Sequence, residues 1–311
     1  MNICITGALG HIGSALIRNI SVLSIDKVYL IDNLSTQRYS SLFDLPKDIN
    51  YCFYEMDILS DDIEAVIKDS DVLIHLAAVT NAEASFYNRE ILENVNKKGL
   101  KKVAELCSEY DCSLIFPSST SVYGIQEGLV DEDCKEKDLK PQSPYADSKL
   151  YGEELLKSLA GQKGLRFVTF RLGTIFGYSI GMRFHTAVNK FIWQASLNQD
   201  ITVWKTALNQ KRPYCGLNDC INAFNHAVKE GIFDCKIYNI VTANLTVKDI
   251  LDVIREYIPR INIKFVDSPI MNQLSYNASN AKSLEKDFVY TDLLKEKVEE
   301  IVAKLKSLNK V

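Results

Sequence analysis

The chain has 311 residues, of which 47% are hydrophobic and 24% charged, and its formal net charge is −4 at pH 7. These values are ordinary for a globular protein, and the length allows one large or two smaller domains. They give no indication of binding to nucleic acid or to an anionic membrane, and no apolar stretch is long enough to span a bilayer.

The eight cysteines are scattered along the chain without a Cys-x-x-Cys pair, and the four histidines are equally dispersed. This pattern predicts reduced thiols and no metal site. The amino terminus lacks the basic and apolar regions of a secretory signal, so we predict a cytoplasmic protein.

Residues 2–6 are a short apolar run that predicts a buried strand. The run leads into a glycine-rich turn and a helical segment, Gly7-Ala8-Leu9-Gly10-His11-Ile12-Gly13-Ser14. Glycines let the backbone approach a pyrophosphate, and the N–H groups at a helix start favour anions. The spacing differs from the common Gly-x-Gly-x-x-Gly fingerprint, and a tight loop that simply needs glycine is the alternative.

Residues 27–32 are a second apolar run, and this one ends in Asp32. An acid about 20 residues beyond the glycines can accept the adenosine ribose hydroxyls and would repel a 2′-phosphate. Asp32, with Asn33 beside it, therefore favours NAD over NADP. A strand-end capping role for Asp32 is the alternative.

Strand-like and helix-like runs then alternate along the chain. We predict strands over 51–58, 71–78, 113–116, 166–172, 201–204 and 236–241, and helices over 60–68, 88–110, 186–197, 246–257 and 291–308. The acidic, lysine-rich insert 127–140 is predicted to be an exposed loop. Alternation of this kind predicts an α/β fold with a parallel sheet covered by helices on both faces.

A further helix is predicted to begin at Pro144, which places Tyr145 and Lys149 on one helix face. A free tyrosine has a pKa near ~10, and a nearby cation lowers that pKa by favouring the phenolate. The pair can therefore act as a general base. Tyr and Lys at helical spacing are more often only surface residues, so the pair indicates a catalytic function only together with the rest of the chain.

These segments together resemble the extended short-chain dehydrogenase/reductases of the NAD-dependent epimerase/dehydratase family. The resemblance covers nearly the whole chain and is carried by the glycine-rich turn, Asp32-Asn33, Met56-Asp57-Ile58, His75-Leu76-Ala77-Ala78, Pro117 to Gly124, Tyr145 to Lys149, Arg171 to Gly177 and Arg212-Pro213-Tyr214. It implies a Rossmann-type doubly wound parallel sheet, formed by residues 1–174 with about 213–241. A smaller, discontinuous C-terminal substrate lobe would consist of about 175–212 with 242–311.

The resemblance also implies roles for particular residues. Ser119, Tyr145 and Lys149 match the catalytic residues of the family, with Ser118 and Thr120 as neighbours that could be mistaken for Ser119. Contacts to NAD are implied for Gly7, Gly10, His11, Ile12, Gly13, Asp32, Asn33, Asp57, Ile58, Ala77, Ala78, Asn96, Tyr145 and Lys149. Contacts to a nucleotide diphosphate sugar are implied for Thr120, Asn189 and Arg212.

The stretch 268–279 contains no arginine, although the family usually places a second phosphate-binding arginine there. Arg183 or His185 is a candidate substitute. For Arg212, a solvated surface charge is the alternative to a contact with phosphate.

No carboxylate follows Ser119 in the run Thr120-Ser121-Val122-Tyr123, unlike in the family's dehydratases and decarboxylases. This favours an epimerase that acts at C4 through a transient 4-keto sugar. A 4,6-dehydratase, a 4-ketoreductase and a non-catalytic NAD-binding regulator are the alternatives. The resemblance further implies a homodimer formed through the helices at 88–110 and 144–160.

Overall fold

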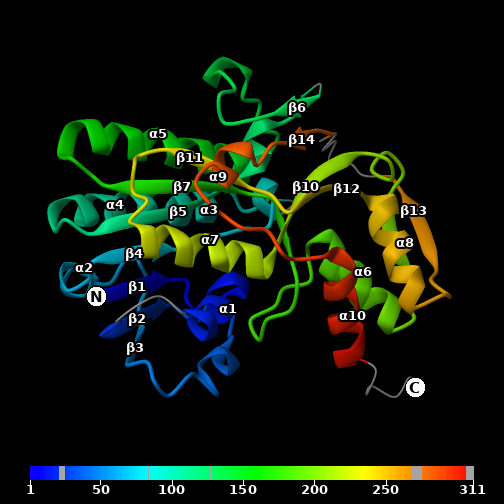
Figure 1. Cartoon of the computed structure of the whole chain (residues 1–311), viewed down its shortest axis with the longest axis horizontal. Coiled ribbons are helices and arrows are strands. Elements are labelled where there is room, and N and C mark those ends of the chain that lie inside the picture. Colours follow the sequence, from blue (N-terminus) through cyan, green and yellow to red (C-terminus); the bar gives the residue numbers. More distant parts are fainter. Residues whose placement is uncertain (21–24, 83, 127, 268–274, 306–311) are drawn as a thin grey trace.

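The computed structural model describes residues 1–20, 25–82, 84–126, 128–267 and 275–305 (Figure 1). Within these residues the main sheet has seven strands in the order β11-β7-β5-β4-β1-β2-β3, and every neighbouring pair is parallel. The strands are β1 (Asn2–Thr6), β2 (Lys27–Asp32), β3 (Tyr51–Glu55), β4 (Val72–His75), β5 (Ser113–Ser119), β7 (Phe167–Leu172) and β11 (Ile237–Ile240). The predicted α/β fold with a Rossmann-type doubly wound sheet is confirmed.

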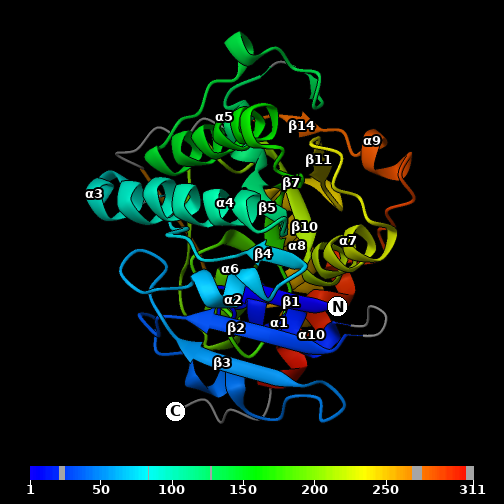
Figure 2. The same ribbon diagram turned by 90° about the vertical axis from the view of Figure 1, so that its left-hand side faces the viewer.

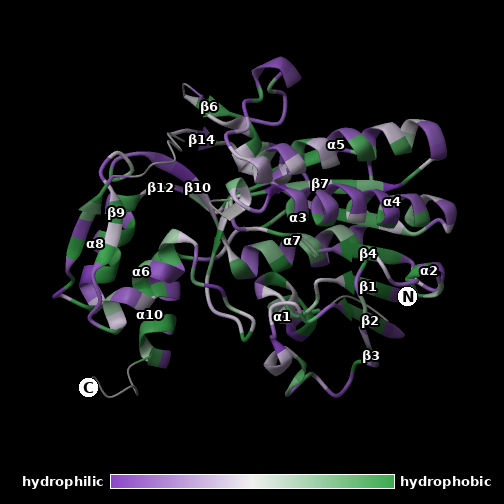
Figure 3. Ribbon diagram, turned by 180° about the vertical axis from the view of Figure 1, so that it is seen from behind, coloured by the Kyte–Doolittle hydropathy of each residue, from purple (hydrophilic) through white to green (hydrophobic). Residues whose placement is uncertain are grey.

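Helices cover both faces of this sheet (Figure 2). One face carries α1 (His11–Asn19) and α7 (Leu217–Glu230), and the other carries α2 (Glu64–Lys68), α4 (Leu100–Glu109) and α5 (Pro144–Lys163). Successive strand residues point to opposite faces, so Ile3 and Ile5 pack with α1 and α7 while Cys4 packs with α2, α4 and α5. The hydrophobic colouring of β1 and β4 in Figure 3 reflects this burial on both sides.

The predicted helix over 88–110 is present, but it is not uniform. It consists of α3 (Arg89–Leu92), a π-helical segment η3 (Glu93–Gly99) and α4. A π-helical turn inserts an extra residue per turn and often occurs at functional sites. Here it buries the side chain of Asn96.

A second group of elements packs around its own core beside the sheet. Its helices are α6 (Ala187–Ser196), α8 (Val247–Tyr257) and α10 (Leu294–Leu305), and its strands are β8 (Thr174–Phe176), β9 (Ile201–Trp204), β10 (Lys211–Gly216), β12 (Ala243–Thr246) and β13 (Ile263–Val266). Thr246 and Asp249 form a capping box at the start of α8, as its predicted boundary requires. The prediction that this region is a separate substrate lobe stays a prediction.

The remaining elements are short and include one correction. The insert 127–140, predicted to be an exposed loop, contains β6 (Leu129–Val130), which pairs with β14 (Asn277–Ala278) and buries Val130. The prediction was wrong there because a two-residue strand carries no periodic pattern; Glu127 lies outside the described residues. The other short helices are α9 (Ala281–Leu284), η1 (Tyr39–Leu42), η2 (Ala84–Phe86), η4 (Thr120–Tyr123) and η5 (Glu136–Asp138).

Candidate active site

The glycine-rich turn lies between β1 and β4, where the strand order of the sheet reverses. Gly7 has a φ of +66°, and a Cβ there would lie 2.5 Å from the Ala77 nitrogen. A Cβ at Gly13 would lie 2.4 Å from the Ala8 carbonyl oxygen. Both positions therefore need glycine so that the turn can pack against β4 and the start of α1. Open α/β sheets bind ligands at such a reversal point.

The acids predicted to hold the adenosine half gather at the carboxyl ends of β2 and β3. Asp32 accepts hydrogen bonds from the backbone N–H groups of Leu9 (3.0 Å) and Leu34 (2.9 Å). The Asn33 amide donates to Asp57 at 2.8 Å. Asp32 thus does cap the turn, and its oxygens keep further lone pairs for ribose hydroxyls. Ile58 is buried, with its Cδ1 against Gly99.

Tyr145, Ser119 and Lys149 meet at the carboxyl end of β5. Ser143 caps α5 by accepting a hydrogen bond from the Ala146 N–H at 3.2 Å, so the helix begins at Pro144 as predicted. The Tyr145 phenol lies near Ser119, whose hydroxyl lowers the pKa of the phenol. Lys149 Nζ donates to the Pro117 carbonyl at 2.7 Å and lies 5.9 Å from the centroid of the Tyr145 ring.

The neighbours of Ser119 point elsewhere. Ser118 Oγ donates to Glu153 Oε1 at 2.5 Å, and Thr120 Oγ1 donates to the Leu172 carbonyl at 3.3 Å. Of these three residues, Ser119 is the one whose hydroxyl acts on Tyr145, and it also accepts hydrogen bonds from the backbone N–H and the hydroxyl of Ser121. Its catalytic role stays a prediction.

Burial and nearby groups act in opposite directions on the pKa of Tyr145. Burial raises the pKa of Tyr145, whereas the positive charge of Arg183 and the hydrogen bond with Ser119 lower it. Burial and the charge of Arg183 lower the pKa of Lys149 to about 7, and Glu153 acts against this. Arg183 is thus a second cation near Tyr145, and the helix spacing of Tyr145 and Lys149 could not reveal it.

Asn96 links the segment after β4 to α5. Its side-chain oxygen accepts from the Val79 N–H at 2.8 Å, and its amide donates to the Val79 carbonyl and to Ser148 Oγ, both at 3.0 Å. Ala77 donates its N–H to Thr6 Oγ1 at 3.4 Å, which ties the Ala77-Ala78 segment to β1. These contacts fix the segment along which a dinucleotide would pass.

The segment between β8 and α6, residues 177–185, crosses the glycine-rich turn, and we call it the strap. His11 Nε2 lies 3.0 Å from the Gly177 carbonyl, and Ser179 Oγ donates to the His11 carbonyl at 2.9 Å. Asn189 accepts from the Gly177 N–H at 3.2 Å and donates to the Arg183 carbonyl at 3.4 Å. Asn189 is fully buried and holds the strap; its predicted contact with substrate stays a prediction.

Arg212 lies in another part of the site, partly buried on β10. Burial raises the pKa values of Tyr214 and Tyr276 to about 12, and the charge of Arg212 acts against this at both residues. The Thr120 hydroxyl also acts against this effect of burial at Tyr276. Arg212 and Thr120, both predicted to contact the substrate, are therefore linked through Tyr276, a residue that no sequence pattern singled out.

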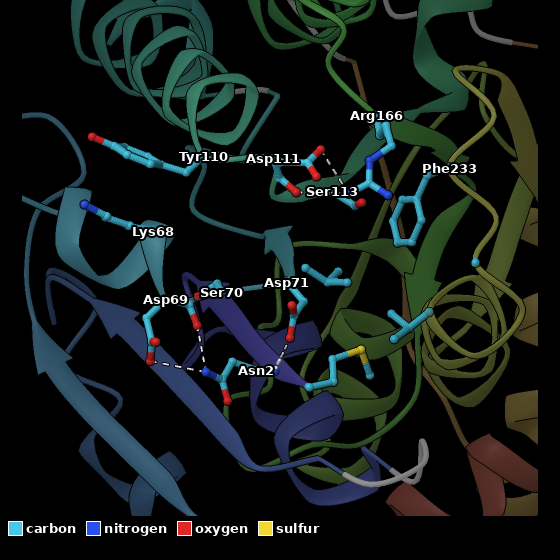
Figure 4. A pocket seen from close by; sticks show the side chains of 14 residues that line it. Asn2, Lys68, Asp69, Ser70, Asp71, Tyr110, Asp111, Ser113, Arg166 and Phe233 are labelled. Atoms are coloured by element: carbon cyan, nitrogen blue, oxygen red, sulfur yellow. Dashed lines mark hydrogen bonds and ion pairs between the residues drawn. The ribbon is translucent and has the colours of Figure 1, made fainter.

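A polar pocket of about 670 Å³ lies at the opposite, amino-terminal end of the strands (Figure 4). Its polar groups bind one another: the Asn2 N–H donates to Asp71, and Arg166 pairs with Asp111. It holds none of the predicted site residues. Among the described residues, no group of acidic, histidine and cysteine side chains could hold a metal ion, and no helix has the length and apolar character that a membrane crossing needs.

Comparison with known proteins places these features in a family. The sequence profile of the "NAD dependent epimerase/dehydratase family" matches residues 3–240. An uncharacterized UDP-glucose epimerase of Bacillus subtilis is 28% identical over 231 residues, which are 71% of this chain and 70% of that protein. A putative UDP-glucose 4-epimerase of Methanocaldococcus jannaschii is 28% identical over 82% of each chain.

Solved structures of epimerases are similar over almost their whole length. The UDP-glucuronic acid 4-epimerase of Bacillus cereus, in complex with UDP-glucuronic acid and NAD, has a TM-score of 0.88 at 25% identity over 99% of this chain and 100% of that one. The UDP-N-acetylglucosamine 4-epimerase of Methanobrevibacter ruminantium has a TM-score of 0.83 at 25% identity over 97% and 98%.

Proposed function

Because the chain belongs to the NAD-dependent epimerase/dehydratase family, we propose that it epimerises a nucleotide-activated sugar at C4 through a transient 4-keto intermediate. The observation that carries this proposal is the meeting of Tyr145, Ser119 and Lys149 at the open end of the sheet. The similar proteins named above include epimerases that bind UDP-sugars, which supports a UDP-sugar as the substrate class.

The residues at the switch point fit NAD as the cofactor. A Cβ added at Gly10 would lie 3.7 Å from Arg38 Nη1, so a cation lies beside the turn. The turn would hold the pyrophosphate, and Asp32 and Asn33 the adenosine ribose. Asp57 and Ile58 would contact the adenine, while Ala77, Ala78 and Asn96 would line the path to the nicotinamide half. When bound, NAD accepts and returns the hydride of C4.

The chain's own residues would accept and return the proton of the C4 hydroxyl. Tyr145, as the phenolate, takes the proton of the C4 hydroxyl while the C4–H bond gives up its hydride. Arg183 and Lys149 favour the phenolate, and Ser119 orients the reacting oxygen. After the 4-keto sugar has rotated so that its other face receives the hydride, Tyr145 returns the proton to the oxygen at C4. The opposite configuration at C4 results. Arg212 would bind the substrate diphosphate, and Thr120 and Asn189 would also contact the substrate.

Other reactions remain distinguishable by their products. A 4,6-dehydratase would release a 4-keto-6-deoxy sugar, and a 4-ketoreductase would consume reduced cofactor in equal amount to product. A non-catalytic NAD-binding regulator would turn over no sugar. No carboxylate side chain follows Ser119 in the short helix η4, which favours the epimerase.

The test is to incubate the protein with UDP-, GDP-, CDP- and dTDP-sugars and to identify the products by NMR. We expect the C4 epimer of one UDP-sugar without net consumption of NAD. Tyr145→Phe should lower kcat by about 10²- to 10⁴-fold while NAD still binds. Turnover that survives in Tyr145→Phe, or a product other than an epimer, would contradict the proposal.

The predicted homodimer and the cytoplasmic location stay predictions. Exposed apolar side chains beside and on α3, Phe86, Tyr87 and Ile91, support an interface near the predicted helices. Sedimentation velocity tests the dimer, and a single species at the mass of one chain would contradict it.

A further inference from the structure

The strap is attached directly to the glycine-rich turn. Besides the two contacts with His11, the Gly181 N–H donates to Ser14 Oγ at 2.9 Å. A Cβ at Gly181 would lie 2.5 Å from the Leu9 carbonyl oxygen and 2.6 Å from the Gly10 carbonyl oxygen. The carbonyl side of the turn is thus covered by the strap, which leaves the N–H side for a ligand.

Arg183 extends from the strap across the site to the end of β4. Its Nη1 donates to Thr80 Oγ1, three residues beyond Ala77. Within the described part of the chain, its Nε is buried and has no hydrogen-bond partner, and neither has His11 Nδ1 on the turn itself. A buried guanidinium N–H without a partner costs free energy unless an acceptor arrives.

Several basic groups converge here. Arg38 Nη1 lies 3.7 Å from the place that a Cβ at Gly10 would take. Burial lowers the pKa of Arg183, and the positive charge of Arg38 lowers it further. The charge of Arg183 likewise adds to the effect of burial in lowering the pKa values of His11 and Lys149. An anion with more than one negative charge between the two arginines would relieve this repulsion.

We propose that Arg183, carried by the strap, binds the pyrophosphate of the dinucleotide and closes the cofactor site from the side of the second core. Sequence alone suggested Arg183 for the diphosphate of the sugar nucleotide, which has the same chemistry. Its attachment to the glycine-rich turn and to Thr80 favours the dinucleotide, because Arg212 lies elsewhere, beside Tyr276 and Thr120. The proposal rests on NAD as the cofactor in the proposed function.

Calorimetric titration of the full-length protein, freed of bound nucleotide, with NAD, ADP-ribose and UDP tests this. ADP-ribose keeps the pyrophosphate but lacks the nicotinamide, so it removes any effect through Tyr145. Arg183→Ala should weaken both NAD and ADP-ribose about 10- to 100-fold, as expected for a lost hydrogen bond to a charged group. UDP binding to the NAD-saturated protein should change less than twofold.

Matched variants make the result specific. Arg166→Ala removes an exposed arginine that pairs with Asp111, and it should leave all three affinities unchanged. Gly181→Ala displaces the strap without touching a charge and should also weaken NAD and ADP-ribose. If Arg183→Ala melts early, Arg183→Gln serves in its place.

Affinities of Arg183→Ala for NAD and ADP-ribose within twofold of wild type would overturn the inference, and a selective loss of UDP would assign Arg183 to the sugar nucleotide instead. Neither result touches the epimerisation test, because these titrations involve no turnover. A wild-type protein that binds neither NAD nor ADP-ribose would contradict the proposed function itself.

Discussion

At the scale of single residues, the most consequential feature beside α5 is a buried ion pair. Arg171 and Glu153 are joined by two hydrogen bonds of 2.9 and 2.7 Å, and their side chains are 3% and 2% exposed. Glu153 also accepts from Ser118, the neighbour of Ser119, and lies one turn beyond Lys149. The pair therefore joins β5, β7 and α5 next to Ser119 and one helical turn from Lys149.

Removing one charge of this pair should lower the stability of the protein. Glu153→Gln leaves the guanidinium of Arg171 buried without its counter-charge, so we expect the free energy of unfolding to fall by about 3–5 kcal/mol in urea titrations. Glu136→Gln, which breaks an exposed pair with Lys157, should change it by less than about 0.5 kcal/mol. Equal losses in the two variants would contradict this account of Glu153.

Some residues of the site could be predicted from a local sequence pattern, and others could not. Tyr145 and Lys149 could be found because helical spacing and Pro144 fix their relative position. Arg183, Arg38, Thr80 and Tyr276 could not, since each reaches the site from a loop or a short strand whose course depends on distant contacts. The resemblance did provide Arg183 as a candidate, but for the diphosphate of the substrate and not for its effect on Tyr145.

At the scale of elements, α5 owes its closeness to the sheet to Gly152. A Cβ there would lie 2.5 Å from Phe116 Cζ and 2.7 Å from Leu100 Cδ2. The Phe116 ring is buried, and Lys149 Nζ lies 4.8 Å from its centroid. The positions of α5 and of the Lys149 ammonium are thus both set by packing against the Phe116 ring.

Two glycines of α5 give a matched comparison. Gly152→Ala should lower the free energy of unfolding by about 1–3 kcal/mol, because the new methyl group overpacks Phe116. Among the described residues, no heavy atom outside the helix backbone lies within 4 Å of the place that a Cβ at Gly161 would take. Gly161→Ala should therefore raise stability by about 0.5–1 kcal/mol. Thermal melts of the two variants check this, and the same sign for both would refute it.

Elements with a strong periodic pattern were predicted well. The strands at 27–32 and 201–204 have the predicted bounds, and α5 and α8 begin where their caps indicated. The strand predicted over 71–78 is shorter, ending at His75, because Leu76 to Ala78 leave the sheet to follow the glycine-rich turn. The π-helical segment at Asn96 and the pairing of β6 with β14 depend on tertiary contacts that no local pattern encodes.

At the scale of the whole molecule, buried histidines couple stability to pH. Burial lowers the pKa values of His11 and His75 to about 3 from the ordinary 6.5. In the unfolded chain both would take up a proton near pH 6.5, whereas the folded protein keeps them neutral. Their contribution to stability is therefore complete above pH 6.5 and is lost as the pH falls toward 3.

Urea unfolding at pH 7.5, 6.5 and 5.5 should show this loss, with about 1 kcal/mol per histidine between pH 6.5 and 5.5. His75→Gln replaces the imidazole, which lies 2.9 Å from Thr6 Oγ1, by a neutral amide and should remove about 1 kcal/mol of the decline. A variant that loses stability as steeply as the wild type would show that other groups cause the dependence.

The order of strands in the main sheet also has a consequence for synthesis. β7 ends at Leu172, and its neighbour β11 begins only at Ile237, after the chain has passed through β8, α6, β9, β10 and α7. A nascent polypeptide that has emerged only as far as Leu172 carries β7 with one row of backbone hydrogen-bonding groups uncovered, which is a template for aggregation. The ribosome must synthesise residues 173–240 before β11 can pair with the free edge of β7. The speed of translation across this segment therefore bears on the yield of native protein.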